Sequence, residues 1–173
     1  MTPGAGAPDF DWFGFEDVVA DELRTVARAL VYQADGELPY AYVLTVFYAE
    51  RAGPILLPHP ALGTVESVPP HELWDPPAWP RSDRGWARRA PLDAWQDRLE
   101  RLVEGLGEED WDAAHARYGY ALLGAMRRAK AELVADGTFP SGIVCVLDDE
   151  EEDLLRKSAT ARELRAFRAV RQE

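Results

Sequence analysis

The sequence predicts an α+β fold, with a small, mostly antiparallel sheet packed against several helices. Helical periodicity dominates both halves of the chain, and strand-like segments are few and short. Strands and helices do not alternate regularly, which argues against a doubly wound parallel sheet. Hydrophobic residues make up 47% of the 173 residues, enough for the core of one domain. We therefore expect a flexible tail over residues 1–8 and a single domain over residues 9–173.

An amphipathic helix is expected to open the domain. Apolar residues recur there at helical spacing with charged residues between them, and Asp9 or Asp11 can cap its start. Gly36 lies just beyond its end, where a left-handed backbone is often needed. The expected buried stripe consists of Phe15, Val18, Val19, Leu23, Val26, Ala27, Leu30 and Val31.

A β-hairpin is expected next. Residues 40–48 are rich in β-branched and aromatic side chains, which predicts a strand buried on both faces for part of its length. Residues 50–54 have the composition of a turn, and residues 55–57 would form a short second strand.

A long loop follows, at residues 58–91. It holds seven prolines, which block helix, and three tryptophans, Trp74, Trp79 and Trp86. We expect an ordered loop whose tryptophans pack on the sheet or a helix, since exposing them to water is costly. Long loops in compact domains often carry function, and if this loop is a binding surface, at least one tryptophan should stay partly exposed as an anchor.

Two helices, a strand and one or two terminal helices complete the predicted order. Apolar residues at helical spacing predict helices from Pro91 to about Leu106 and from Trp111 to Leu133. A short apolar strand containing Cys145 then runs into the acidic stretch 148–153. The residues expected to be buried together are Leu23, Val26, Leu30, Val43, Leu44, Val46, Leu122, Met126, Val144 and Val146.

Composition excludes several classes of function. With 31 acids against 19 bases the formal charge is −12, which disfavours nucleic acid and anionic membranes and leaves a basic protein as a compatible partner. The N-terminus lacks the features of a signal peptide. A single cysteine, Cys145, suits a reducing cytoplasm and reads as a small buried side chain. No cofactor-binding motif is present, and we expect no cofactor.

The acidic stretch 148–153 has three interpretations. Carboxylates at a helix start are stabilised by its free N–H groups, and this interpretation is favoured. A calcium or magnesium site is the second, although the stretch lacks the alternation and glycine of an EF-hand loop, and we expect no tightly held metal. The third is a docking surface for a basic partner, made by Asp148, Asp149 and Glu150.

The three histidines do not form a recognised motif. His59 and His71 lie within the long loop, and with Glu66 they could line a ligand pocket beneath it if the loop folds back. His115 lies on the apolar stripe of the second long helix, where a half-buried, hydrogen-bonded histidine is the favoured interpretation.

The order of several short motifs resembles the bacterial family known as domain of unknown function 4303. The motifs are the tyrosine-rich segment 40–48, Thr64-Val-Glu66, the segment 73–79 with its two tryptophans, Asp136-Gly-Thr-Phe139 and Lys157-Ser158. The resemblance covers roughly residues 12–170. It implies a bacterial protein without an assigned activity and, by analogy, an immunity-type protein that binds a toxin.

Two hypotheses follow from the sequence. The first is a non-catalytic cytoplasmic domain that binds another protein through Trp74, Trp79, Trp86 and the acidic residues Asp148, Asp149 and Glu150. The alternative is an enzyme or small-ligand-binding protein with His59, Glu66 and His71 in a pocket under the loop. A flat aromatic patch rimmed by acids would favour the first, and a deep pocket with perturbed titratable groups the second.

Overall fold

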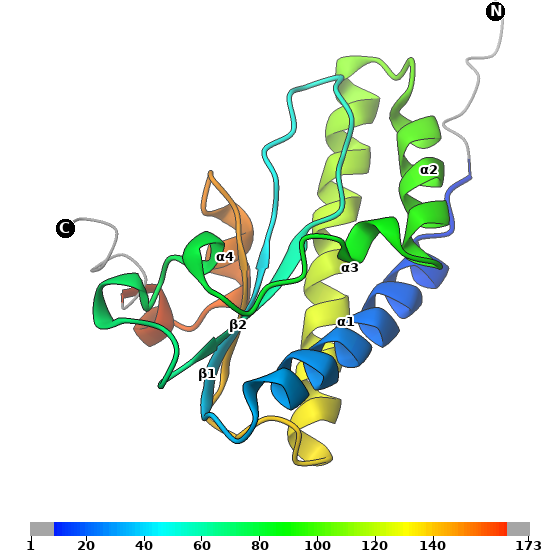
Figure 1. Cartoon of the computed structure of the whole chain (residues 1–173). Coiled ribbons are helices and arrows are strands. Elements are labelled where there is room, and N and C mark those ends of the chain that lie inside the picture. Colours follow the sequence, from blue (N-terminus) through cyan, green and yellow to red (C-terminus); the bar gives the residue numbers. More distant parts are fainter. Residues whose placement is uncertain (1–8, 166–173) are drawn as a thin grey trace, which may run out of the picture.

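The computed structural model describes residues 9–165 and shows an α+β fold around a three-stranded mixed sheet. The strand order is β2-β1-β3, with β1 (Pro39–Thr45) antiparallel to β2 (His59–Thr64) and parallel to β3 (Val144–Asp148). Helices α1 (Trp12–Ala34), α2 (Leu92–Val103) and α3 (Glu108–Ala135) pack on one side of the sheet (Figure 1). The short α4 (Asp153–Ser158) and the part of the proline-rich loop that carries Trp74 and Trp79 lie on the other side.

Helix α1 begins and ends as its sequence predicts. The Asp11 carboxylate accepts a hydrogen bond from Gly14 N at 2.9 Å and caps the helix. The helix ends at Asp35 and Gly36, both with positive φ. Its buried stripe crosses α3, where Leu122 and Met126 are also buried.

The two faces of the sheet bury different sets of side chains. Side chains alternate along a strand, so Leu44 joins the helices on one face whereas Val43 packs with Trp79 on the other. The residues expected to share one core are therefore divided between two clusters. All of them are buried except Val144, which is half-buried and packs against the smaller cluster.

The predicted hairpin is wrong in its second strand. The partner of β1 is residues 59–64, and residues 55–57 belong to an extended arm, residues 46–58, that runs beside α2 and α3 (Figure 1). A side chain replaces a strand partner here: Gln96 Oε1 accepts from Leu57 N at 2.8 Å, and Gln96 Nε2 donates to Ile55 O at 3.0 Å. These two residues are thus buried without a sheet ladder.

The proline-rich segment folds into short 3-10 turns at Pro70–Glu72, Pro76–Ala78 and Trp86–Arg88. Part of it covers the free edge of β2, because Leu62 N donates to Arg81 O at 2.8 Å and Asp83 N donates to Pro60 O at 3.0 Å. Trp79 packs beneath the sheet and Trp86 among the helices, so the packing predicted for these two tryptophans is confirmed.

Within residues 9–165, no helix combines the length and the apolar character that a membrane crossing requires. The expected terminal helices correspond to α4 and to a further helical segment that covers residues 161–165. Phe167 and Val170, assigned to the last helix from the sequence, lie outside the described residues.

Candidate functional site

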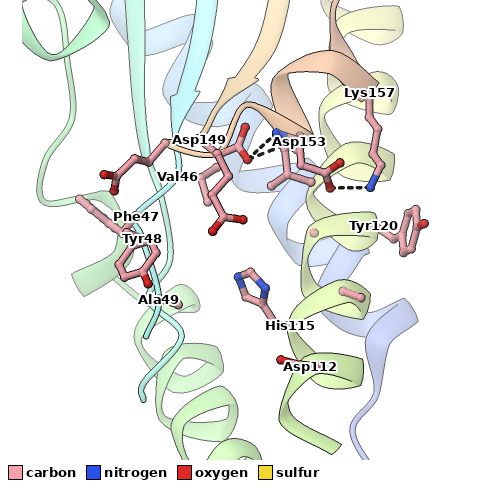
Figure 2. Close-up of a pocket in the computed structure, with 15 residues that line it drawn as sticks. Val46, Phe47, Tyr48, Ala49, Asp112, His115, Tyr120, Asp149, Asp153 and Lys157 are labelled. Carbon is pink, nitrogen blue, oxygen red and sulfur yellow. Dashed lines mark hydrogen bonds and ion pairs between the residues drawn. The ribbon is translucent and has the colours of Figure 1, made fainter. Parts of the chain in front are cut away.

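A cavity of about 330 Å³ lies where the chain leaves the carboxyl ends of β1 and β3. Parallel strands end at the same edge of a sheet, and ligands in α/β proteins often bind there. One wall comes from residues 46–49 and another from α3 between Asp112 and Tyr120. The third comes from residues 149–157, which include the start of α4 (Figure 2). We call this cavity the acidic pocket.

His115 projects from α3 into the acidic pocket (Figure 2). Its imidazole stacks on Trp111, with centroids 4.9 Å apart and planes 13° apart, and on Tyr118, with centroids 6.3 Å apart and planes 27° apart. Trp111 is itself fixed, because its Nε1 donates to Gly53 O at 2.8 Å. Burial lowers the pKa of His115, while Glu151, Asp112 and Asp149 act in the opposite direction. The imidazole is therefore neutral near pH 7.

Three of the pocket's five carboxylates have partners within the chain. Asp112 binds the Arg51 guanidinium through both oxygens, at 3.0 and 2.7 Å. Asp149 accepts from Asp153 N at 3.0 Å, Leu154 N at 3.2 Å and Leu155 N at 2.9 Å, and so caps the first turn of α4. Asp153 pairs with Lys157 at 2.6 Å.

The other two carboxylates, Glu150 and Glu151, are exposed at the pocket. Neither side chain makes a hydrogen bond or ion pair with another residue in the described part of the chain. The only ammonium in the lining is that of Lys157, which lies 5.3 Å from the centroid of the Tyr120 ring. The pocket thus has an excess of negative charge, part of it uncompensated.

Two exposed tyrosines complete the lining. Tyr48 and Tyr120 are each 61% exposed, although large aromatic side chains elsewhere in the fold are mostly buried. Figure 2 shows them on opposite sides of His115. Exposed aromatic side chains around a charged cavity are typical of a binding site.

The residues proposed from the sequence as a protein-binding surface do not form one surface in the structure. Trp79 and Trp86 are only 2% and 0% exposed, so they stabilise the core and offer no surface to a partner. Trp74 is half-buried against Tyr40. Asp148 is also buried, at the end of β3. Of the three acids proposed for that surface, Asp149 follows the helix-start interpretation, and only Glu150 is both exposed and part of the pocket.

The residues of the alternative hypothesis do not converge. His59 starts β2 and packs edge-on against Phe47, whereas Glu66 lies beyond the other end of that strand, roughly 20 Å along it. Glu66 accepts from Leu38 N at 2.8 Å. His71 is exposed beside Glu72 on a separate turn. The acidic pocket contains no residue of 58–91, so it is not the pocket that was expected under the loop.

Sequence reasoning missed Tyr48, Tyr120, Lys157 and the role of His115. Only one signal pointed to this place, namely an apolar strand that runs directly into acids. The pairing of that strand with residues 41–45, which brings the other walls together, leaves no local pattern in the sequence.

The lining carries five carboxylates and one ammonium, which makes the pocket chemically suited to a cation. Within residues 9–165 there is no group of three or more histidines, cysteines and acids arranged to hold a metal ion. Cys145 is buried, and burial raises its pKa to about 12, so its thiol stays protonated.

Comparison with known proteins adds no relative: no family model, no curated protein and no solved structure matches this chain.

Proposed function

We propose that this protein is a non-catalytic binding domain that captures a basic segment of another protein at the acidic pocket. The observation that carries the proposal is the pair of exposed, unpartnered carboxylates, Glu150 and Glu151, beside a cavity flanked by the exposed Tyr48 and Tyr120. Charged groups left without internal partners lose little when they bind an opposite charge from outside.

The charge of the whole molecule supports the same function. A formal charge of −12 attracts basic partners over a distance set by the ionic strength and raises the rate of encounter. The proposal keeps the cytoplasmic location that a single cysteine favours. An immunity-type protein that binds a toxin, as the family resemblance implies, would be one instance of this function.

Binding is favoured over catalysis by the state of His115. A general base is usually oriented by a hydrogen bond to a third group. No residue of the described part of the chain makes such a bond to this imidazole, which is held by ring stacking instead. His115 is better suited to form a wall than to transfer protons.

Fluorescence anisotropy with labelled peptides tests the proposal. A basic peptide should bind the protein, an acidic peptide of the same length should not, and added salt should weaken binding. The double variant Glu150→Gln/Glu151→Gln should reduce affinity about tenfold or more. The control, Glu104→Gln/Glu109→Gln, makes the same charge change at exposed residues outside the pocket. Equal affinities for the two double variants would refute the pocket as the binding site.

A further inference from the structure

The geometry points to one specific occupant: the side chain of an arginine, presented by a basic protein segment, that lies against His115 with its guanidinium at Glu150 and Glu151. This inference rests on the proposed function and specifies the group that the acidic pocket recognises. Four features of the pocket favour arginine over other ligands. They are the size of the cavity, its aromatic wall, its unpaired carboxylates and the ammonium that it already contains.

The volume of the cavity favours a side chain. Pockets for small molecules cover roughly 300–1,000 Å³, and this one, at about 330 Å³, lies at the lower end. Glu150 in its lining is exposed to solvent, so a bound peptide can keep its backbone in water.

A planar aromatic wall favours a planar cation. His115 stacks on Trp111 and also on Tyr118, whose ring centroid lies 6.3 Å away with the planes at 27°, so the imidazole is held in a stack of three rings and is the member that lines the pocket. Guanidinium groups stack on aromatic faces and are more weakly hydrated than ammonium groups. The protein already uses this contact, since the Arg98 guanidinium lies 3.8 Å from the centroid of the Trp95 ring.

The carboxylates favour a forked donor. In the wall of the same pocket, Asp112 binds the Nε and Nη2 of Arg51 through both of its oxygens. Glu150 and Glu151 are adjacent in the chain and have no such partner among residues 9–165. A second guanidinium can therefore find two-oxygen contacts that the first has not used.

A lysine side chain should bind in the pocket less tightly than an arginine side chain. The position that suits it, between an aromatic face and a carboxylate, is already filled by Lys157, which contacts Tyr120 and Asp153. An incoming lysine would have to displace this ammonium or remain hydrated at the rim.

Three peptides that differ at one position test the inference. Basic peptides carrying arginine, lysine or citrulline at the centre keep their length and context, and citrulline is a neutral analogue of arginine. The arginine peptide should bind about tenfold more tightly than the other two. This preference should disappear in the double variant Glu150→Gln/Glu151→Gln.

A second pair of variants tests the cavity itself. Ala116 lines the pocket on α3, so Ala116→Phe should fill it and remove the arginine preference. Ala113 is exposed on the same helix and does not line the pocket, so Ala113→Phe should leave the preference intact. Thermal melts of both variants establish that they are folded.

The outcomes separate this inference from the proposed function. If basic peptides bind and respond to Glu150→Gln/Glu151→Gln but lysine equals arginine, the arginine inference is overturned and the proposed function stands. An arginine preference that survives Ala116→Phe also overturns the inference. If no basic peptide binds, both fail.

Discussion

Arg81 binds Glu37 through two hydrogen bonds, Nη2 to Oε1 at 2.6 Å and Nε to Oε2 at 3.1 Å. The pair joins the proline-rich segment to the connection between α1 and β1. Arg81 also donates to Gln33 O at 3.0 Å, and Thr64 donates to Glu37 at 2.5 Å. One guanidinium thus fixes the loop to both the first helix and the sheet.

We expect this network to make stability depend on acid. The Arg81 hydrogen bond, followed by that of Thr64, lowers the pKa of Glu37 from 4.5 to about 2. A lowered carboxyl pKa adds stability above pH 4.5, and this contribution is lost as the pH falls towards 2. In urea melts, Glu37→Gln should be less stable than the parent protein at pH 7 and equal to it near pH 2. A difference that does not change with pH would contradict the assignment.

Leu122 is a test of the larger core cluster. Its side chain is fully buried on α3 at the crossing with α1, so Leu122→Ala should cost ~2–5 kcal/mol in the free energy of unfolding. Leu38→Ala is the control, because that leucine is 54% exposed and should cost far less. A loss below about 1 kcal/mol for Leu122→Ala would remove the residue from the core.

Gln96 is expected to hold the extended arm. Its amide satisfies Leu57 N and Ile55 O, so Gln96→Leu leaves a buried donor and a buried acceptor unpaired. The cost should be about 1–3 kcal/mol for each group left unsatisfied. Hydrogen exchange provides a local measurement: the Leu57 amide should exchange much faster in the variant, whereas amides in the middle of α3 should not. If the Leu57 amide exchanges equally slowly in the variant, another group must accept its hydrogen bond.

Binding of a basic ligand should weaken below pH 6.5. The pKa of His115 lies below its ordinary value of 6.5, so its positive charge is absent near neutrality and appears as the pH falls. The new charge repels a cation in the pocket, while Asp112 from α3 and Asp149 and Glu151 from the turn after β3 partly offset it. Protonation also reduces stability, because the unfolded chain takes up the proton first. Affinity measured from pH 7.5 to 5 should fall in the parent protein and change less in His115→Gln.

The acidic stretch should not hold a metal ion tightly. Asp149 directs both carboxylate oxygens at backbone N–H groups of α4, and those oxygens are then poorly placed for an ion. Calorimetric titration with calcium, magnesium and manganese should show no micromolar site. Micromolar affinity that is abolished by Asp148→Asn with Asp149→Asn would prove this wrong. Asp149→Ala should instead cost about 0.5–2 kcal/mol as the loss of a helix cap.

The helices could be predicted from sequence because their signals are local. The period of the apolar residues, the Asp11 cap and the Asp35–Gly36 end of α1 all lie within the segments they define. The strand ending at Asp148 was recognisable for the same reason. The second strand was misplaced because residues 55–57 are apolar like a strand, whereas β2 begins with a histidine and a proline. The backbone of residues 55–57 is hydrogen-bonded by the side chain of Gln96, which is far away in the sequence, and not by a neighbouring strand.

The candidate site was harder to predict, because it depends on partners far apart in the chain. A tryptophan in a proline-rich loop has the same local sequence whether it is an exposed anchor or, like Trp79 and Trp86, part of the core. Similarly, His115 lies on an apolar stripe, and nothing local indicates that this stretch of α3 faces the ends of two strands. In both cases the answer depends on tertiary packing between segments far apart in the chain.

The parallel pairing of β1 with β3 has a consequence for when the pocket exists. It places Val43 opposite Val146, about a hundred positions apart in the chain, and such non-local contacts require a large loop to close. No contiguous fragment of the first 140 residues contains all three walls, so a nascent or truncated chain cannot present the pocket. A partner that recognises it would distinguish finished molecules from incomplete ones, and each binding event would draw the population towards the native state.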